Sequence, residues 1–360
     1  MRHHGRLHTP DRVPMILAYA APAAGAPLAP FAIERPAPGP RDVQIDILYC
    51  GVCHSDIHQV RGEWGGSVFP MVPGHEIVGR VSAVGAQVGR YRLGDAVGVG
   101  CFIDSCRACS ECRAGMEQYC EEGMTPTYNG RMRGSGEPTW GGYSTRIVVD
   151  QDYVLRIPEG LPLDRAAPLL CAGITTWSPL RHFGVVAGHR VAVMGLGGLG
   201  HMAVKLAVAM GAEVTVLSTS ESKRADALAL GAQDFATTGD GRAFKSHARQ
   251  FDLIIDTVSA PHDYNACLGL LRVDGTLVLL GLPDPAPLSA FPLVSQRRRI
   301  AGSMIGGIAE TQQMLDFCAA HGIAADIELI AADRINEAYE RMLRGDVRYR
   351  FVLDIATLGR

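Results

Sequence analysis

The sequence predicts an α/β protein with a β-rich first part and a second part in which strands alternate with helices. Of its 360 residues, 47% are hydrophobic and 20% are charged, so the chain can bury a sizeable core and extensive disorder is not expected. The composition changes after about residue 160, where short β-branched runs separated by Gly and Pro give way to longer alternating segments. The length suggests two domains.

Short β-branched runs between turn residues predict the strands of the first part, as in a small barrel. These runs are VQIDILYCGV (43–52), IVGRVSAVG (77–85), DAVGVGCF (95–102) and YSTRIVV (143–149). In the second part, apolar strands alternate with amphipathic helices, which predicts a parallel sheet covered on both faces. The segments that carry this pattern are 189–200, 201–211, 212–220, 222–232, 251–259, 264–271 and 275–281. A helix is expected at 310–321.

Four of the ten cysteines lie within 15 residues, at positions 106, 109, 112 and 120. Four thiolates fill the tetrahedral coordination of Zn²⁺ and leave no open position, so such a site holds a loop together without taking part in chemistry. An iron–sulfur cluster can use similar spacing, and redox thiols are a further alternative. We interpret Cys106, Cys109, Cys112 and Cys120 as ligands of a structural zinc.

Three separate segments offer ligands for a second metal. Cys53 lies in CGVCHSDIH, His75 and Glu76 lie in PGHE, and Cys171 lies in LLCAGITTW. Two thiolates and an imidazole, with a fourth position left for water or substrate, are typical of a catalytic zinc. Taken singly, a Cys in an apolar run is more often a core residue, and a His after Pro-Gly is more often a turn residue.

A glycine-rich turn, GLGGLG at 195–200, follows the apolar strand VAVM and precedes a helical pattern. In that context it predicts a dinucleotide site that includes Gly195, Gly197, Gly198, Leu199 and Gly200. Gly195 permits the tight turn, Gly197 lets the backbone approach the pyrophosphate, and Gly200 allows close packing of helix and sheet.

The strand after this turn indicates which dinucleotide is bound. An NAD enzyme places Asp or Glu at its end to hold the ribose hydroxyls, whereas this chain has STSESKR at 218–224. Hydroxyls and cations accept a 2′-phosphate, so we predict NADP(H), with Ser218, Thr219, Ser220 and Lys223 around the phosphate. Ser220 can equally serve as a helix N-cap.

Taken together and in this order, CGVCHSD, GHE, the four clustered cysteines, LLCAGITTW and GLGGLG resemble the zinc-dependent medium-chain alcohol dehydrogenases. Within them the chain resembles the cinnamyl-alcohol-dehydrogenase branch and its bacterial NADPH-dependent aldehyde reductases, over about residues 40 to 353. The resemblance implies a GroES-like catalytic domain at 1–167 and 305–360, which contains both zinc sites. It also implies a doubly wound Rossmann nucleotide-binding domain at 168–304.

The resemblance also implies roles for single residues. Cys53, His75 and Cys171 would hold the catalytic zinc, with Glu76 as an outer or alternate ligand. Asp56 would orient the zinc-bound histidine. Ser55 would pass on the proton, and the relay would end at His58. The implied reaction is the reversible reduction of aromatic and aliphatic aldehydes to primary alcohols with NADPH. Trp64, Tyr128, Trp140 and Trp177 are candidates for the pocket wall.

Other function classes fit the sequence less well. The net charge of −3 gives no reason to expect a nucleic-acid partner, and no apolar run is long enough to span a bilayer. The N-terminus lacks the apolar core of a signal peptide, so a cytoplasmic location is expected. RRRIAGSMIGG (297–307) resembles the segment through which the family dimerises, so we expect a homodimer. A catalytically silent relative and a secondary-alcohol or polyol dehydrogenase are the alternatives.

Overall fold

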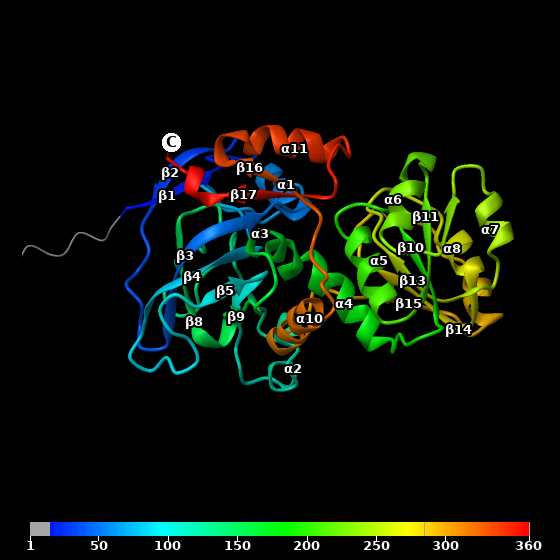
Figure 1. Cartoon of the computed structure of the whole chain (residues 1–360), viewed down its shortest axis with the longest axis horizontal. Coiled ribbons are helices and arrows are strands. Elements are labelled where there is room, and N and C mark those ends of the chain that lie inside the picture. Colours follow the sequence, from blue (N-terminus) through cyan, green and yellow to red (C-terminus); the bar gives the residue numbers. More distant parts are fainter. Residues whose placement is uncertain (1–14, 284, 360) are drawn as a thin grey trace, which may run out of the picture.

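The computed structural model describes residues 15–283 and 285–359, and these form two sheet-based parts that lie side by side (Figure 1). The first part is built from residues before 160 together with the C-terminal segment. The second part is built from the middle of the chain. This arrangement confirms the predicted α/β class with a β-rich part and a doubly wound part.

The first part contains a seven-stranded, mostly antiparallel sheet. Its strands, in pairing order, are β16 (Ile327–Ala331), β17 (Arg350–Asp354), β3 (Asp42–Gly51), β4 (Ile77–Val84), β5 (Ala96–Val99) and β9 (Leu155–Arg156), while β8 (Arg146–Asp150) also pairs with β3. Buried and more exposed residues alternate along most of β3, as expected for a strand with one face on the core. Among the described residues no pairing joins β9 to β16, so the sheet does not close into the barrel that the sequence suggested.

Smaller elements surround this sheet. Two hairpin-like pairs are formed by β1 (Ile16–Ala20) with β2 (Ala29–Ile33), and by β6 (Phe102–Asp104) with β7 (Thr125–Pro126). The helices are α1 (His54–Arg61), α2 (Ser110–Arg113), α3 (Leu163–Ala166) and α11 (Ile335–Leu343). The chain also has 3₁₀ turns at Glu117–Tyr119, Gln151–Tyr153, Ala167–Leu170, Glu221–Lys223, Ala332–Arg334 and Ile355–Thr357.

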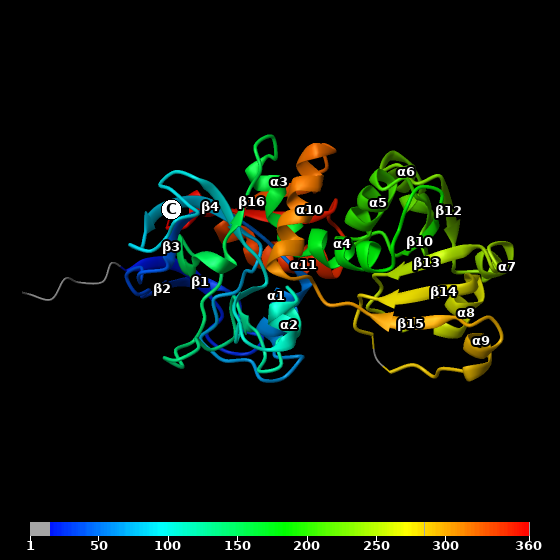
Figure 2. The same ribbon diagram turned by 90° about the horizontal axis from the view of Figure 1, so that it is seen from below.

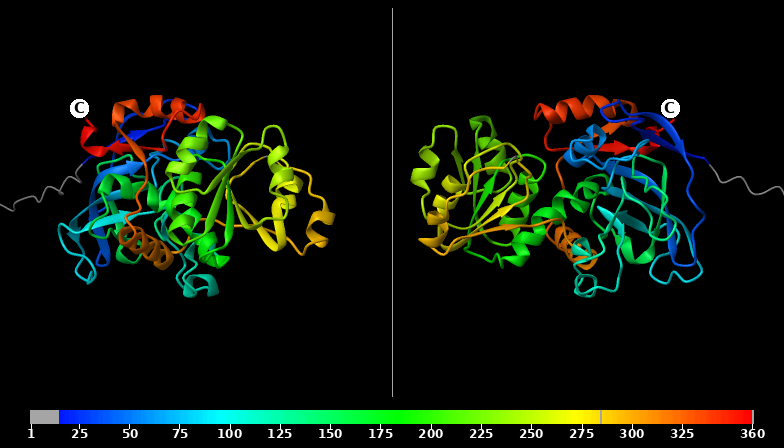
Figure 3. Two further views of the ribbon diagram at one scale, coloured as in Figure 1. Left: turned by 45° about the vertical axis from the view of Figure 1, so that its right-hand side comes forward. Right: turned by 180° about the vertical axis from the view of Figure 1, so that it is seen from behind.

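The second part is a six-stranded sheet in which every neighbouring pair is parallel. Its order is β12 (Asp234–Thr237), β11 (Glu213–Ser218), β10 (Arg190–Met194), β13 (Phe251–Asp256), β14 (Leu271–Leu279) and β15 (Arg299–Gly302). Helices lie on both faces (Figure 3), namely α5 (Gly200–Ala209), α6 (Arg224–Ala229), α7 (Arg242–Ser246), α8 (Tyr264–Leu270) and α9 (Ala290–Val294). The strand order reverses beside β10, and ligands bind at that point in sheets of this kind.

Two helices join the parts, α4 (Ala172–His182) and α10 (Ile308–Ala320). One apolar cluster includes Ile174 and Trp177 of α4, Met314 of α10, and side chains from both sheets. This shared core fixes the start of α4 relative to the seven-stranded sheet. It also makes Trp177, a candidate for the pocket wall, a core residue packed on Phe317.

In the part of the chain that the structure describes, no helix has both the length and the apolar composition needed to cross a lipid bilayer.

His201 is a fully buried histidine at the start of α5. Its ring stacks on Tyr349 with a centroid separation of 4.9 Å, and neither ring nitrogen has a hydrogen-bond partner. Burial lowers the pKa of His201 to about 3, so the folded protein holds it as a neutral ring.

Replacing His201 with Leu should flatten the pH dependence of stability. The unfolded chain protonates this histidine below its ordinary pKa of about 6.5, whereas the folded chain does so only near 3. The stabilisation is therefore complete above pH 6.5 and is lost as the pH falls toward 3. Urea unfolding gives the free energy of unfolding of each protein. The value for wild type minus the value for the variant should fall by about 2 kcal/mol from pH 7 to pH 5.

Candidate metal centres and nucleotide-binding turn

Four metal-ligating side chains from three distant segments meet in the interior. One donor atom from each of Cys53, His75, Glu76 and Cys171 lies within 4.8 Å of the others, and all four residues are buried. The two sulfur atoms are 3.9 Å apart, and His75 Nε2 is 3.3 Å from Cys171 Sγ. The structure thus brings together the predicted ligand set, whose members are up to 118 residues apart in the sequence.

Local structure places each donor. Cys53 precedes α1 as its N-cap, and Cys171 precedes α4 in the same way. His75 follows Gly74, which has a positive φ of 102°, and a Cβ there would lie 2.8 Å from Cys50 Sγ. Only glycine fits this turn, and the turn directs His75 toward the sulfurs.

Asp56 fixes the orientation of His75. Its Oδ1 lies 3.1 Å from His75 Nδ1, and its Oδ2 accepts the Cys53 backbone N–H at 2.9 Å. With Nδ1–H donated to the carboxylate, the Nε2 lone pair faces the two thiols, and this is the tautomer that a metal requires. Asp56 therefore lies where the sequence resemblance placed an orienting carboxylate.

Glu76 is bound to a residue that sequence reasoning missed. Its carboxylate forms a buried ion pair with Arg350 of β17, while its second oxygen has no hydrogen-bond partner. Burial raises the pKa of Glu76 to about 8, against the opposing charge of Arg350. Arg350 also lies against the glycine turn, because a Cβ on Gly198 would be 2.8 Å from its side chain. It therefore links the metal ligands to the nucleotide site.

The donor set suits a soft divalent cation. Hydrogen bonding with Cys171, supported by the charge of Arg350, lowers the pKa of the Cys53 thiol well below its usual value. Two thiols and an imidazole match the preference of zinc for sulfur and nitrogen ligands. Cys101 lies beside this cluster and donates toward the Leu170 carbonyl at 3.7 Å, although no sequence spacing marked it.

The four clustered cysteines form the second metal-ligating group, with their sulfur atoms within 4.8 Å of one another. Backbone N–H groups point at three of the sulfurs, at distances of 3.3 to 3.4 Å: Cys106 N to Cys120 Sγ, Cys109 N to Cys106 Sγ, and Cys112 N to Cys109 Sγ. Backbone N–H groups of Glu121 and Cys112 lower the pKa of Cys109 to about 6. All ten cysteines are free thiols, so the cluster is not a pair of disulfides.

The glycine turn joins β10 to α5 at the point where the strand order reverses. Gly195 has φ of 85°, and a Cβ on Gly200 would lie 2.1 Å from the Gly195 carbonyl oxygen. A Cβ on Gly197 would meet nothing within 4 Å, so that side of the turn is open. Backbone N–H groups and the N-terminus of α5 therefore face an open position suited to a phosphate.

The segment after β11 lies beside this turn. Ser218 ends the strand and is buried, and Lys223 Nζ donates to the Leu196 carbonyl of the glycine turn at 3.0 Å. Arg224 pairs with Glu221, so each of these charges offsets the other. Thr219 is exposed and Ser220 is half-buried beside them, and Ser220 makes no side-chain capping bond.

The two relay candidates lie on α1. Ser55 Oγ is 3.6 Å from Cys53 Sγ, next to the metal-ligating group. His58 lies one turn further on, is partly exposed, and approaches Glu63 Oε2 at 2.5 Å through Nδ1. Its ring stacks on Trp64 with centroids 4.9 Å apart.

Tyr128 and Trp140 take different positions near this region. The Tyr128 ring stacks on His75 at 5.7 Å and so lies beside the metal-ligating group. Trp140 packs against the apolar core that includes Ile45 and Ile47 of β3, and its ring centroid lies 6.4 Å from that of Phe31.

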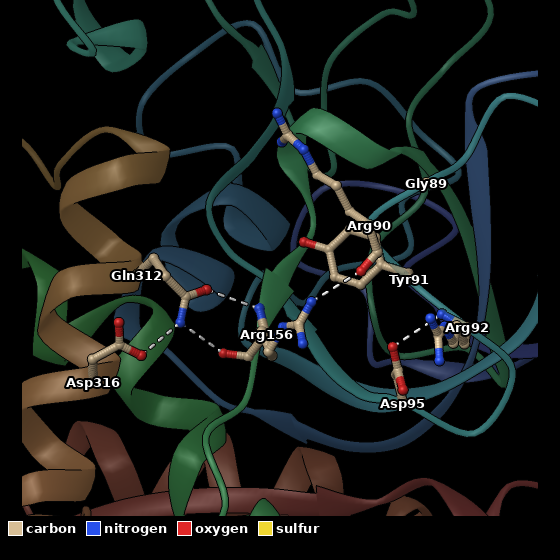
Figure 4. Close-up of a pocket in the computed structure, with 8 residues that line it drawn as sticks. All are labelled: Gly89, Arg90, Tyr91, Arg92, Asp95, Arg156, Gln312 and Asp316. Atoms are coloured by element: carbon tan, nitrogen blue, oxygen red, sulfur yellow. Dashed lines mark hydrogen bonds between the residues drawn. The ribbon is translucent and has the colours of Figure 1, made fainter.

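A surface cavity of about 660 Å³ lies between the 89–95 loop, β9 and α10 (Figure 4). Its polar groups bind one another: Arg156 donates to the Arg90 carbonyl at 2.9 Å, and Gln312 bridges the Arg156 backbone and Asp316. None of its lining residues belongs to a metal-ligating group or to the glycine turn, so it is not the candidate active site.

Comparisons with known proteins agree with this geometry. Residues 39–159 match the alcohol dehydrogenase GroES-like domain, and residues 198–320 match the zinc-binding dehydrogenase family. The chain is 60% identical to NADP-dependent alcohol dehydrogenase C 1 of Mycolicibacterium smegmatis, over 95% of this chain and 99% of that protein. It is 57% identical to aldehyde reductase YahK of Escherichia coli, with the same coverage.

Among solved structures, a cinnamyl alcohol dehydrogenase of Sorghum bicolor superposes with a TM-score of 0.93 at 46% identity, covering 95% of this chain and 98% of that one. The Helicobacter pylori cinnamyl alcohol dehydrogenase, solved with NADP(H), gives a TM-score of 0.89 at 44% identity with the same coverage. Identities this high over nearly the whole chain indicate membership of the same family, and not only a shared fold. The chain therefore belongs to the zinc-dependent medium-chain alcohol dehydrogenases, in their cinnamyl-alcohol-dehydrogenase branch.

Proposed function

We propose that this protein is a zinc-dependent oxidoreductase that reduces aldehydes to primary alcohols with NADPH, reversibly and with broad specificity. The observation that carries the proposal is the buried group of two thiols and an imidazole, which Arg350 joins to a glycine turn. The relatives named NADP-dependent alcohol dehydrogenase and aldehyde reductase support this substrate class and this cofactor.

In this proposal Cys53, His75 and Cys171 hold the catalytic zinc, and Glu76 is an outer or alternate ligand paired with Arg350. Bound zinc would supply Lewis-acid polarisation of the substrate carbonyl, and bound NADPH would supply the hydride. Cys106, Cys109, Cys112 and Cys120 hold a structural zinc with no open position.

Ser55 and His58 move the proton. The Ser55 hydroxyl lies beside the Cys53 sulfur, so it can donate to an oxygen held there. His58 is partly exposed and bound to Glu63, so it can exchange protons with water. The intact ligand set argues against a silent relative. A cysteine at 171 argues against those polyol dehydrogenases that use an acidic ligand there.

For NADPH, the glycines at 195, 197, 198 and 200, with Leu199, surround the pyrophosphate, and the segment at 218–223 surrounds the 2′-phosphate. Lys223 is the cation closest to this role, because its ammonium already reaches the turn at Leu196. We place the domain boundaries at 1–167 with 305–360, and at 168–304. The residue ranges of the two sheets support this division. Free thiols throughout the chain support a cytoplasmic location.

The protein is also proposed to form a homodimer through β15. This strand lies at one edge of the six-stranded sheet, and within the described residues only β14 pairs with it (Figure 2). Near this edge Phe291 and Val294 expose 78% and 77% of their surface, and Leu282 and Leu288 are exposed as well. An unpaired edge beside exposed apolar side chains is suited to pairing with a second copy.

Replacing Cys171 with Ala should abolish turnover but leave NADPH affinity within about twofold, since the glycine turn is unchanged. Metal analysis should find about two zinc ions per wild-type chain and one in the variant. Cys318→Ala, which changes a buried cysteine outside both ligand sets, should retain both ions and activity. Retained activity in the Cys171 variant would assign the metal to other residues.

Replacing Lys223 with Ala should weaken NADPH binding on the order of tenfold or more and leave NADH nearly unaffected, because only NADPH carries the 2′-phosphate. Fluorescence titration of both nucleotides measures the difference. Lys245 is an exposed lysine on α7 and serves as the control. Equal effects on the two nucleotides would show that Lys223 does not contact the phosphate.

Light scattering at micromolar concentration should give the mass of two chains. Phe291→Glu should shift the protein to a single chain, because it places a charge within the apolar edge. Leu93→Glu alters another exposed leucine outside this edge and should leave the dimer intact. A wild-type protein with the mass of one chain would contradict the assembly without affecting the proposed chemistry.

A further inference from the structure

The Asp56 carboxylate is fully buried and accepts four hydrogen bonds. Its Oδ1 faces His75 Nδ1 at 3.1 Å and the Gly74 backbone N–H at 3.3 Å. Its Oδ2 accepts from the Cys53 backbone N–H at 2.9 Å and from the Tyr143 hydroxyl at 3.1 Å. A buried carboxylate is stable only when its oxygens are well hydrogen-bonded, so each of these donors helps to fix its position.

Tyr143 is the one donor of the four that is neither a backbone group nor a candidate metal ligand. Two of the others are backbone groups, and the third belongs to His75, which Asp56 orients. The hydroxyls of Tyr128 and Tyr339 lie close to Asp56 and Tyr143, respectively, yet neither makes a hydrogen bond of normal length and angle. Within the described residues, Tyr143 is therefore the side-chain hydroxyl that holds Asp56.

The backbone around Tyr143 is held firmly against the ligand segment. Gly141 N donates to Val72 O at 2.8 Å, Gly142 N to Gly74 O at 2.8 Å, and Tyr143 N to Pro73 O at 3.0 Å. Arg35, which is half-buried, donates to the carbonyls of Trp140 and Gly141. The segment that carries the tyrosine is thus hydrogen-bonded along its backbone to the segment that carries His75.

We infer that Tyr143 is a positioning residue of the catalytic metal site, which holds Asp56 so that His75 presents Nε2 to the metal. The inference rests on the proposed function, because it requires Cys53, His75 and Cys171 to bind zinc. Outer-shell partners of metal-bound histidines typically change metal affinity by 10- to 100-fold. Tyr143 acts one step further out, so its hydroxyl should account for about tenfold.

The test removes only the hydroxyl. Tyr143→Phe, loaded with zinc, is mixed with a chromophoric chelator, and zinc release is followed over time alongside metal counts. One zinc per chain should leave about tenfold faster than in wild type, while the second leaves at the wild-type rate. Tyr91→Phe is the matched control: it also removes a buried tyrosine hydroxyl that donates a hydrogen bond, here to the Val154 carbonyl in another region. Both zinc ions should leave it at wild-type rates.

A double-mutant cycle separates positioning from packing. If the hydroxyl acts through the carboxylate, Tyr143→Phe should have almost no further effect on zinc release in an Asp56→Asn background. Additive effects, or unchanged release from Tyr143→Phe alone, would overturn the inference. Equal loss of both zinc ions with a lowered melting temperature would overturn it too, because that result indicates general destabilisation. A wild-type chain that binds only one zinc would refute the proposed function before any variant is compared.

Cobalt provides a second readout that does not depend on turnover. Co²⁺ bound to thiolates and imidazole has visible absorption bands that depend on ligand geometry. Exchanged into the catalytic site, it should show shifted bands in Tyr143→Phe and unshifted bands in Tyr91→Phe. Bands identical to wild type in Tyr143→Phe would count against a positioning role.

Discussion

The site depends on balancing the electrostatic repulsion among buried acidic groups. Cys53, Cys171, Glu76 and Asp56 are all buried in one small region, where negative charges repel strongly. Arg350 offsets one of them, and His75 donates to another. A divalent cation bound by the two sulfurs, as proposed above, would offset the remaining charge. Metal binding and a fully formed ligand geometry are therefore expected to stabilise each other.

Arg350 also connects the two parts of the molecule. Arg350 belongs to β17 of the seven-stranded sheet, pairs with Glu76 just before β4, and lies against Gly198 of the other part. One guanidinium thus contacts both the candidate metal-ligating group, through Glu76, and the glycine turn. The apolar core that contains α4 and α10 also joins the two parts, here by packing. Because α4 begins directly after Cys171, this packing also helps to position that cysteine.

Local sequence patterns predicted the fold well. The glycine turn falls between β10 and α5 as expected, and the helices expected at 264–271 and 310–321 occur as α8 and α10 within three residues at each end. Hydrophobic periodicity and turn chemistry are local signals, and they suffice for these elements. The spacing of the clustered cysteines also singled them out, because all four lie on one short loop, and the structure brings their sulfur atoms together.

Contacts between distant segments could not be predicted in this way. Cys53, His75 and Cys171 have no informative spacing, so only resemblance to a family singled them out. Arg350 lies 274 residues from Glu76 and Tyr143 lies 87 residues from Asp56, and neither stands in a recognisable motif. Trp177 could be named only as a candidate for the pocket wall, because an aromatic side chain in a sequence gives no sign of whether it faces a core or a pocket.

The bond from Lys223 to the Leu196 carbonyl has a consequence for nucleotide affinity. A free lysine loses considerable rotamer entropy when it grips an anion. Here the Lys223 ammonium is hydrogen-bonded to the glycine turn before any ligand binds. Much of its rotamer entropy has therefore already been lost during folding. Preorganisation of this kind favours tight, selective capture over rapid adjustment to different ligands.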